Sequence, residues 1–551
     1  MGERAAAAVI IAIFVLTPLI ERVRRARRRR RDAALFWGED DRPHALDEQE
    51  LRDVGAYCRE RSAQEPSAVD ALTWNDLNMD DVFLRLDRAC SGVGEELLYD
   101  MLHRTDAPRE TLARRERIQR VAAGDERART QMRRALRKLG RRRFHGACGY
   151  LFQPKSRQIA HPNAYLALGL APTASVLLAL LIHPALLLLT AALFAVNLAV
   201  YYRSSRVFMR EIAAVRHIAA VIETARALAQ ALPPELEDIA SELRECTDAL
   251  ASVRRWNALF AMQRVSEFDF LTDYIRIFFQ LDMVCLGRLG ARFVRESERL
   301  RRLYALVGET DACLALASFR AAHADTCFPS FIEEMRIEAR GMAHPLIERP
   351  VPCDVTLAGG ALITGSNASG KSTFIKAVAV NAILAQSVCL GVAGSLRLPR
   401  MRVITSMALR DSVQGGESYF VVEVRSLRRM LECVLSGEPV LCCVDEILRG
   451  TNTTERIAAS RALLRALDRA NCLCVAATHD LELTRLLDGY RQLHFAETLS
   501  DAGMTFPYTL MEGPSTTRNA IALMRQMGFP QELTQEAEDA ARVFEESGKW
   551  A

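Results

Sequence analysis

The run Gly365–Thr373 constrains this chain more than any other stretch of its 551 residues. It reads G-S-N-A-S-G-K-S-T, a complete G-x-x-x-x-G-K-[ST] phosphate-binding motif. The apolar run Ala361–Thr364 before it predicts a buried strand, and the spacing from Phe374 to about Gln386 predicts a helix. In this context the backbone N–H groups of the loop and the positive end of the helix converge on one anion.

Each part of the motif has a predicted role toward ATP and Mg²⁺. Lys371 is expected to reach the β- and γ-phosphates, and the Ser372 hydroxyl is expected to ligate Mg²⁺. The alternative is a glycine-rich turn that matches the motif by chance. The candidate nucleotide-binding residues of the loop are Gly365, Ser366, Asn367, Ala368, Ser369, Gly370, Lys371, Ser372 and Thr373.

Two further apolar strands are predicted downstream, and each ends in polar residues. Val440–Glu446 ends in two carboxylates, so that Asp445 can hold the Mg²⁺ shell and Glu446 can orient and polarise the attacking water. The strand that begins at Cys472 ends in His479, which can sense a γ-phosphate by hydrogen bonding from the carboxyl end of the strand. Glu446, His479 and Lys371 are therefore the candidate catalytic residues, and Ser372 and Asp445 the candidate metal ligands.

A second anion site is predicted between these motifs. In the segment Asp411–Glu423, Gly415-Gly416 frees backbone N–H groups, and Ser418 lies at the start of a predicted helix. One nucleotide does not need two such sites on one subunit. The segment is therefore expected to cap the ATP of a partner subunit, which predicts a homodimer with ATP at its interface.

Cysteine usage indicates a reducing compartment. The 14 cysteines form no disulfide-like array, and many lie in apolar runs, as reduced core thiols do. Cys472 and Cys474 are compatible with a metal or redox site, but no second ligand pair is evident, which favours core packing. The net charge of +4 is small, although basic residues are unevenly spread.

Three membrane spans are predicted from apolar length and flanking charge. Ala5–Ile20 precedes an arginine run that ends at Arg31, so it is interpreted as an uncleaved anchor with its N-terminus outside; a soluble amphipathic helix is the alternative. Residues 165–202 carry no Asp, Glu, Lys or Arg, and His183-Pro184 near the middle predicts a hairpin of two spans. A buried soluble hairpin is the alternative. This topology places the chain in the cell membrane, in contact with lipid, and everything after Arg203 in the cytoplasm.

The remaining N-terminal half is predicted to be helical. Arg109–Arg143 is strongly basic and has one apolar side, which is compatible with a solvated helix face, with contacts to nucleic-acid phosphates or with contacts to anionic lipid. Two long amphipathic stretches, roughly Glu235–Met262 and Phe268–Val307, predict lever helices.

These motifs together resemble the MutS-related ATPase family, specifically a membrane-anchored MutS-like protein. The resemblance covers about Arg340–Val543, including the Gly450-Thr451 turn and the HPLI sequence that begins at His344. It implies an α/β P-loop NTPase with an ABC-like ATPase head, joined to an all-α helical core or lever region with transmembrane helices. Cys353 stands where the family usually has Asn, so contacts to the nucleotide base are expected to differ there.

The resemblance also implies a domain order and a function. Residues 1–40 leave no room for a mismatch-reading domain, so a membrane-tethered, ATP-dependent homodimeric switch related to mismatch repair is expected, with DNA binding through the basic region. The alternatives are a membrane scaffold or signalling ATPase that binds an unknown protein and no DNA, and an ABC-type transporter. The predicted parts are the anchor and arginine run 1–31, helical core 47–160, hairpin 165–202, lever 203–340, ATPase domain 341–510 and C-terminal dimerisation helices 511–551.

Overall fold

The chain forms two compact units, each composed of several stretches of sequence. The helical unit comprises residues 1–66, 86–100 and 113–323, and the sheet unit comprises residues 67–85, 101–112 and 324–551. The computed structural model describes residues 37–38, 46–141, 143, 145–153, 159, 161–250, 275–366, 369–407, 419–495, 498–500, 503–515 and 520–547. The predicted anchor (1–31), Asn367, Ala368 and Ser418 lie outside these residues.

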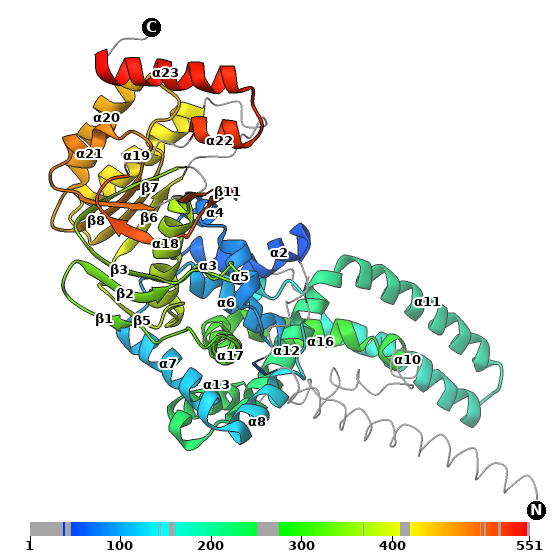
Figure 1. The fold of residues 1–551 in the computed structure, drawn as a ribbon. Coiled ribbons are helices and arrows are strands. Elements are labelled where there is room, and N and C mark those ends of the chain that lie inside the picture. The colour runs from blue at the N-terminus through cyan, green and yellow to red at the C-terminus, as the bar shows by residue number, and fades with distance from the viewer. Residues whose placement is uncertain are drawn as a thin grey trace, which may run out of the picture. The chain divides into compact units, whose positions relative to one another are not determined.

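The sheet unit is organised around a six-stranded sheet with the order β12-β9-β4-β8-β7-β6 (Figure 1). Five of the strands are parallel, and β12 pairs antiparallel with β9 at one edge. The predicted α/β fold of this part is confirmed. The strands are β4 (Gly360–Thr364), β6 (Arg402–Ser406), β7 (Val440–Asp445), β8 (Cys472–Ala477), β9 (Arg491–Phe495) and β12 (Leu510–Glu512).

The central strands are apolar at nearly every position because helices cover both faces of the sheet. Every residue of β4, β7 and β8 is buried. Helix α18 (Lys371–Val388) packs on one face, and α19 (Tyr419–Leu435) and α20 (Thr453–Leu467) pack on the other. Cys472 and Cys474 belong to the hydrophobic core under α19 and α20, as core packing predicts.

Smaller elements complete the sheet unit. Thr405 Oγ1 of β6 donates to Asp76 Oδ2 at 2.7 Å, which ties the early helix α4 to the sheet. The second sheet has the order β1-β5-β2-β3, and β10 pairs with β11. The elements are α4 (Ala71–Asp76), α5 (Met79–Leu86), β1 (Ser330–Phe331), β2 (Arg336–Met342), β3 (Cys353–Ala358), β5 (Ser395–Leu398), β10 (Thr498–Ser500), β11 (Gly503–Thr505), α21 (Glu482–Leu486), α22 (Ala520–Gln526) and α23 (Gln531–Ser547).

The described residues of the helical unit contain helices and no strand. The predicted stretch Phe268–Val307 is not one helix, because Glu296 leaves the helical region with φ −103° and ψ 21°. The helices are α2 (Glu48–Val54), α3 (Ala56–Ser62), α6 (Gly92–Leu102), α7 (Arg109–Gly124), α8 (Glu126–Leu136), α9 (Cys148–Phe152), α10 (Pro162–Leu181), α11 (Leu186–Val207), α12 (Met209–Ala229), η1 (Pro234–Leu236), α13 (Glu237–Ala249), α16 (Leu281–Arg295) and α17 (Ser297–Ala322).

Helices α10 and α11 form an antiparallel hairpin whose turn contains His183-Pro184, as the sequence predicts (Figure 1). Both helices are long and apolar enough to cross a membrane, and they are the two candidate spans among the described residues. Most large apolar side chains on them are exposed. The polar groups inside the hairpin bond to one another instead: Thr190 Oγ1 donates to Ser175 Oγ at 3.0 Å.

Several arginines of the basic region Arg109–Arg143 are paired with acidic side chains. Arg115 Nε donates to Glu309 Oε1 at 2.7 Å, and Arg114 contacts the other oxygen of the same buried carboxylate. Arg141 and Arg143 both contact the buried Glu95. These pairs join segments of the helical unit that are distant in sequence, so these arginines of the basic run serve the packing of this unit.

Candidate functional site

The loop between β4 and α18 has the backbone shape that its two glycines allow. Gly365 has φ 140°, and a Cβ there would lie 2.8 Å from Ser369 Oγ. Gly370 has φ 105°, and a Cβ would lie 3.1 Å from the Tyr508 ring. Residues with a side chain rarely adopt such φ values, so both positions require glycine. The two glycines therefore allow the backbone to turn at both ends of the loop, and Gly370 leads directly into the first turn of α18.

Lys371 and Ser372 begin α18 directly after this loop. Lys371 is 3% exposed, and its Nζ donates to the carbonyl oxygens of Gly365 and Ser366, both at 2.6 Å. Ser369 Oγ donates to Ser366 O at 2.8 Å. The lysine ammonium is thus held at the mouth of the loop, and Thr373 follows on the same helix turn.

Strands β4, β8 and β7 are neighbours in register, and this brings the predicted side chains to one edge of the sheet. Ile363 pairs with Ala477, which in turn pairs with Asp445. Because the carboxyl ends of parallel strands meet at one edge, the residues that follow them face a common space. Asp445, Glu446 and His479 therefore lie beside the start of α18.

Asp445 is buried, and it interacts with the first turn of α18. Burial raises the pKa of its carboxyl group, while a hydrogen bond with Ser372 and the charge of Lys371 oppose this rise. Asp445 Oδ1 has no hydrogen-bond partner within the described residues. A buried carboxylate oxygen of this kind is available to a further donor or to a cation.

Glu446 makes two charged contacts. Its Oε1 lies 2.7 Å from His479 Nε2, and its Oε2 lies 2.9 Å from an Arg449 nitrogen. The hydrogen bond from His479, with the charges of His479, Arg449 and Lys371, holds the pKa of Glu446 below its usual range despite partial burial. Glu446 is therefore a carboxylate at neutral pH. Of its two partners, His479 is a residue that the sequence predicts for the site, and Arg449 is not.

The turn after β7 is strained. Glu446 has φ 56° and Leu448 has φ 55°, although neither is glycine. Each non-glycine residue in this region costs on the order of 1–3 kcal/mol, and such strain gathers at functional sites. In this backbone conformation the Glu446 side chain reaches His479. No sequence pattern reveals the shape of the turn.

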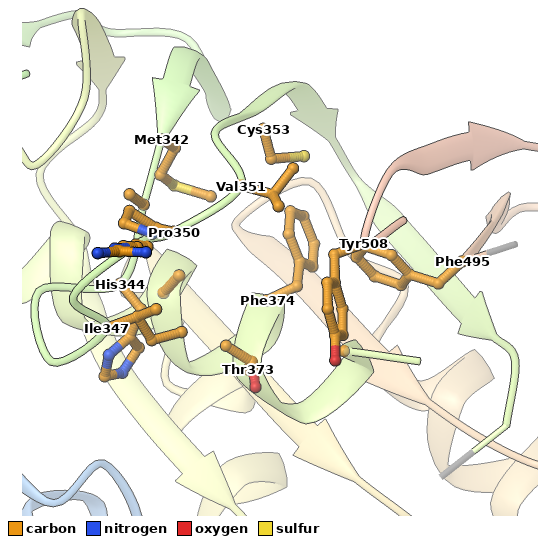
Figure 2. Close-up of a pocket in the computed structure, with 14 residues that line it drawn as sticks. Met342, His344, Ile347, Pro350, Val351, Cys353, Thr373, Phe374, Phe495 and Tyr508 are labelled. Carbon is orange, nitrogen blue, oxygen red and sulfur yellow. The ribbon is translucent and has the colours of Figure 1, made fainter. Parts of the chain in front are cut away.

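An apolar cavity of about 320 Å³ lies beside the same glycine loop (Figure 2). Phe374, Phe495 and Tyr508 gather at one end of it, and His344 and Ile347 line the other end. Phe374 and Phe495 meet edge to face, with ring centroids 5.8 Å apart. Cys353 also lines the cavity, whereas Tyr508 is a lining residue that the motifs do not predict.

Comparisons with known proteins agree with this architecture. The model of the MutS domain V family matches residues 361–545, which include the glycine loop and all three strand ends. Residues 361–545 thus form a domain of the MutS-related ATPase family.

Curated members of the MutS-related ATPase family resemble about half of the chain. It is 33% identical over 255 residues to a "DNA mismatch repair protein MutS" of Thermus thermophilus, covering 45% of this chain and 31% of that protein. It is 34% identical over 261 residues to the "DNA mismatch repair protein MutS 2" of Halobacterium salinarum, covering 45% of this chain and 30% of that protein. The chain thus spans about 30% of the length of these relatives.

Proposed function

We propose that the chain is an ATP hydrolase of the P-loop class, which works as a membrane-tethered, MutS-like homodimeric switch. The observation that carries this proposal is the convergence of Lys371, Asp445 and the Glu446–His479 pair at one edge of the sheet. A chance glycine turn would not be followed by charged side chains on the two neighbouring strands. The family of the chain adds independent support.

The loop and the cavity together fit a nucleoside triphosphate. The loop and the N-terminus of α18 supply backbone N–H groups and the Lys371 ammonium for the phosphates. The cavity adjoins the loop through Gly370 and Thr373, so it is placed to receive the nucleoside. Its aromatic walls suit a planar base, since Tyr508 and Phe374 offer ring faces and edges.

Ser372 and Asp445 fit a Mg²⁺ ion. Both supply oxygen, which is the ligand that Mg²⁺ prefers, and Asp445 Oδ1, which has no hydrogen-bond partner among the residues that the structure describes, is one buried acceptor for it. When bound, Mg²⁺ supplies positive charge that neutralises the phosphate oxygens during transfer.

Glu446 is proposed to orient the water that attacks the γ-phosphate. A carboxylate with a lowered pKa is a weak base, so its main contribution is to hold and polarise the water as a hydrogen-bond acceptor. His479 keeps that carboxylate in place and is expected to donate to the γ-phosphate as well. Lys371 is expected to bind the β- and γ-phosphates.

Substitution of Glu446 tests the ATPase proposal directly. We expect Glu446→Gln in the detergent-solubilised full chain to lower ATP turnover about a hundredfold or more while ATP still binds. Glu438→Gln is the matched control, because Glu438 is an exposed residue just before β7, at the opposite end of the same strand. Equal turnover by the Glu446 variant and the parent chain would show that Glu446 is misassigned.

Homodimer formation is proposed with ATP at the interface. The C-terminal helices α22 and α23 support it, because they expose an apolar surface to which a second copy is the proposed partner. The exposed apolar side chains of this surface are Leu523, Met527, Phe529, Leu533, Val543 and Phe544. The predicted trans contact from Ser418 belongs to this proposal.

DNA binding is proposed from the family alone, since both relatives are named as DNA mismatch repair proteins. The ion pairs of Arg114, Arg115 and Arg141 make the basic region a weaker candidate surface than its sequence indicates. The alternative function is a membrane scaffold or signalling ATPase that binds no DNA. Salt-sensitive binding of duplex DNA by the full chain would argue against that alternative.

Membrane tethering through the α10–α11 hairpin is proposed from its exposure. Leu180, Leu181 and Leu188 near the tip are 78%, 82% and 79% exposed, and helices of 20 and 22 residues give about 30 Å each, which matches the hydrocarbon thickness. Arg203 and Arg206 lie near the end of the second helix and Arg210 lies just beyond it, which favours a cytoplasmic base for the hairpin. With the predicted anchor this gives three spans and a cytoplasmic ATPase domain.

A tryptophan placed at the tip tests insertion. In vesicles that contain brominated lipids, we expect Leu188→Trp to add fluorescence that the lipids quench strongly. Glu298→Trp, on an exposed position of α17, is the control and should not be quenched. Equal quenching of the two added tryptophans would contradict insertion of the hairpin.

A further inference from the structure

The strained turn after β7 is held by a side chain from another helix. The carboxylate of Glu423, in the second turn of α19, accepts the backbone N–H of Leu448. The backbone N–H of Arg449 also bonds to it. Glu423 thus binds two consecutive backbone N–H groups. The first belongs to Leu448, which itself has a positive φ, and both lie within three residues of Glu446.

Glu423 is well buried for a carboxylate. The residue is 9% exposed, and its Oε2 has no hydrogen-bond partner within the described residues. Burying a carboxylate costs desolvation free energy unless hydrogen bonds offset it. Hydrogen bonds from N–H groups to a carboxylate are charge-assisted and are therefore stronger than those between neutral groups.

Helix α19 makes a second contact with the turn through Phe420. A Cβ on Gly450 would lie 3.3 Å from the Phe420 ring, so the first turn of α19 covers the end of the turn closely. Phe420 and Glu423 lie three residues apart on α19 and therefore share one helix face. Together they fix residues 448–450, next to the carboxylate that makes the contact with His479.

We infer that Glu423 is a positioning residue that holds Glu446 in its catalytic orientation. It accepts the N–H groups of the turn and so stabilises the positive φ of Glu446 and Leu448 without touching the nucleotide. The inference rests on the proposed ATPase function. Misplacement of a reacting group by about 1 Å can lower the rate about a hundredfold. Loss of this acceptor should therefore lower kcat.

Three variants of the full chain separate this role from a plain structural one. Glu423→Gln keeps an acceptor oxygen, Glu423→Leu removes it, and Glu432→Leu makes the same change at an exposed glutamate of the same helix. We expect kcat to fall at least about tenfold for Glu423→Leu, with KM changed less than about twofold, because only the transition state depends on Glu446. Glu423→Gln and Glu432→Leu should stay within about threefold of the parent chain.

Hydrogen exchange of the peptide that contains Leu448 and Arg449 supplies a readout that does not depend on hydrolysis. It should speed up in Glu423→Leu and remain slow in the other two variants. Unchanged exchange and unchanged kcat in Glu423→Leu would overturn the inference, as would an equal loss of kcat in Glu423→Gln. If the parent chain hydrolyses no ATP but exchange responds as expected, the proposed function fails while the hold on the turn stands.

Discussion

Two pairs of carboxylates, one pair in each unit of this protein, use their charge in opposite ways. In the helical unit, the carboxylate of Glu309 is contacted by both Arg114 and Arg115, and Asp311 accepts the backbone N–H groups of Cys90 and Ser91. In the sheet unit, Asp445 keeps an oxygen without a partner in the part of the chain that the structure describes, and Glu446 lies in strained backbone. Charge that is fully paired stabilises a fold, whereas charge held open or under strain indicates chemistry.

This difference changes how the basic run is interpreted. Arg109–Arg143 has the composition of a phosphate-binding surface, but its partners Glu309 and Asp238 lie more than a hundred residues further along the chain. No local pattern reveals such pairs.

The first prediction concerns the buried carboxylate of the helical unit. Glu309→Leu should destabilise this unit by about 3–5 kcal/mol, because two guanidinium groups lose their buried partner. Hydrogen exchange in α7 and α17 measures the loss, and Glu298→Leu on the exposed side of α17 is the control. If the two variants exchange alike, the ion pairs do not hold the unit together.

The second prediction concerns the lysine of the sheet unit. Lys371→Ala should weaken ATP binding about tenfold to a hundredfold, because a charged donor to the phosphates is lost. Binding of a fluorescent ATP analogue gives the affinity. Hydrogen exchange in α7 and α17 should be the same as in the parent chain. Faster exchange there would show that the site of the sheet unit and the ion pairs of the helical unit are not independent.

The third prediction concerns pH. His145 Nε2 lies 3.0 Å from Glu96 Oε1, and although burial opposes the charged ring, Glu96, with a smaller contribution from Asp53, raises the pKa of His145 above its usual 6.5. The raised pKa means that protonation stabilises the fold: the contribution is complete below pH 6.5 and is lost as the pH rises through the folded pKa. The protection of α6 from hydrogen exchange should therefore fall as the pH rises through the folded-state pKa of His145. His145→Gln should remove this pH dependence. Identical pH profiles would contradict the assignment.

The fourth and smallest effect concerns the exposed arginines of the basic region. Arg127 and Arg134 are exposed on α8. If the region is structural, alanine at both positions should change DNA affinity less than about twofold and leave the salt dependence unaltered, whereas each lost phosphate contact would lower the salt slope by about one. Titration of duplex DNA at several salt concentrations separates the two results.

The sequence predicts the parts of the site that depend on local order. The glycine loop, the strand before it and the acidic strand end lie in consecutive residues, so β4, α18 and β7 are predicted close to their observed positions. The hairpin is also predicted, because its length and lack of charge are local properties. Glu423, Arg449 and Tyr508 are missed, since each acts through a contact that only the folded chain creates.

The strained turn is the clearest case of information absent from the sequence. Nothing in Glu446-Ile447-Leu448 indicates positive φ, because these residue types disfavour it. The constraint comes from α19, which lies before β7 in the chain and contacts the turn through Glu423 in the folded protein. Functional geometry of this kind is imposed by tertiary contacts and overrides local preference.

The most direct test of the account is the sedimentation velocity of the full chain carrying Glu446→Gln, solubilised in detergent, with ATP and Mg²⁺ or with ADP and Mg²⁺. The account predicts a dimer with unhydrolysed ATP and a monomer with ADP. A variant that remains monomeric with ATP, or that converts ATP to ADP at the rate of the parent chain, would contradict it.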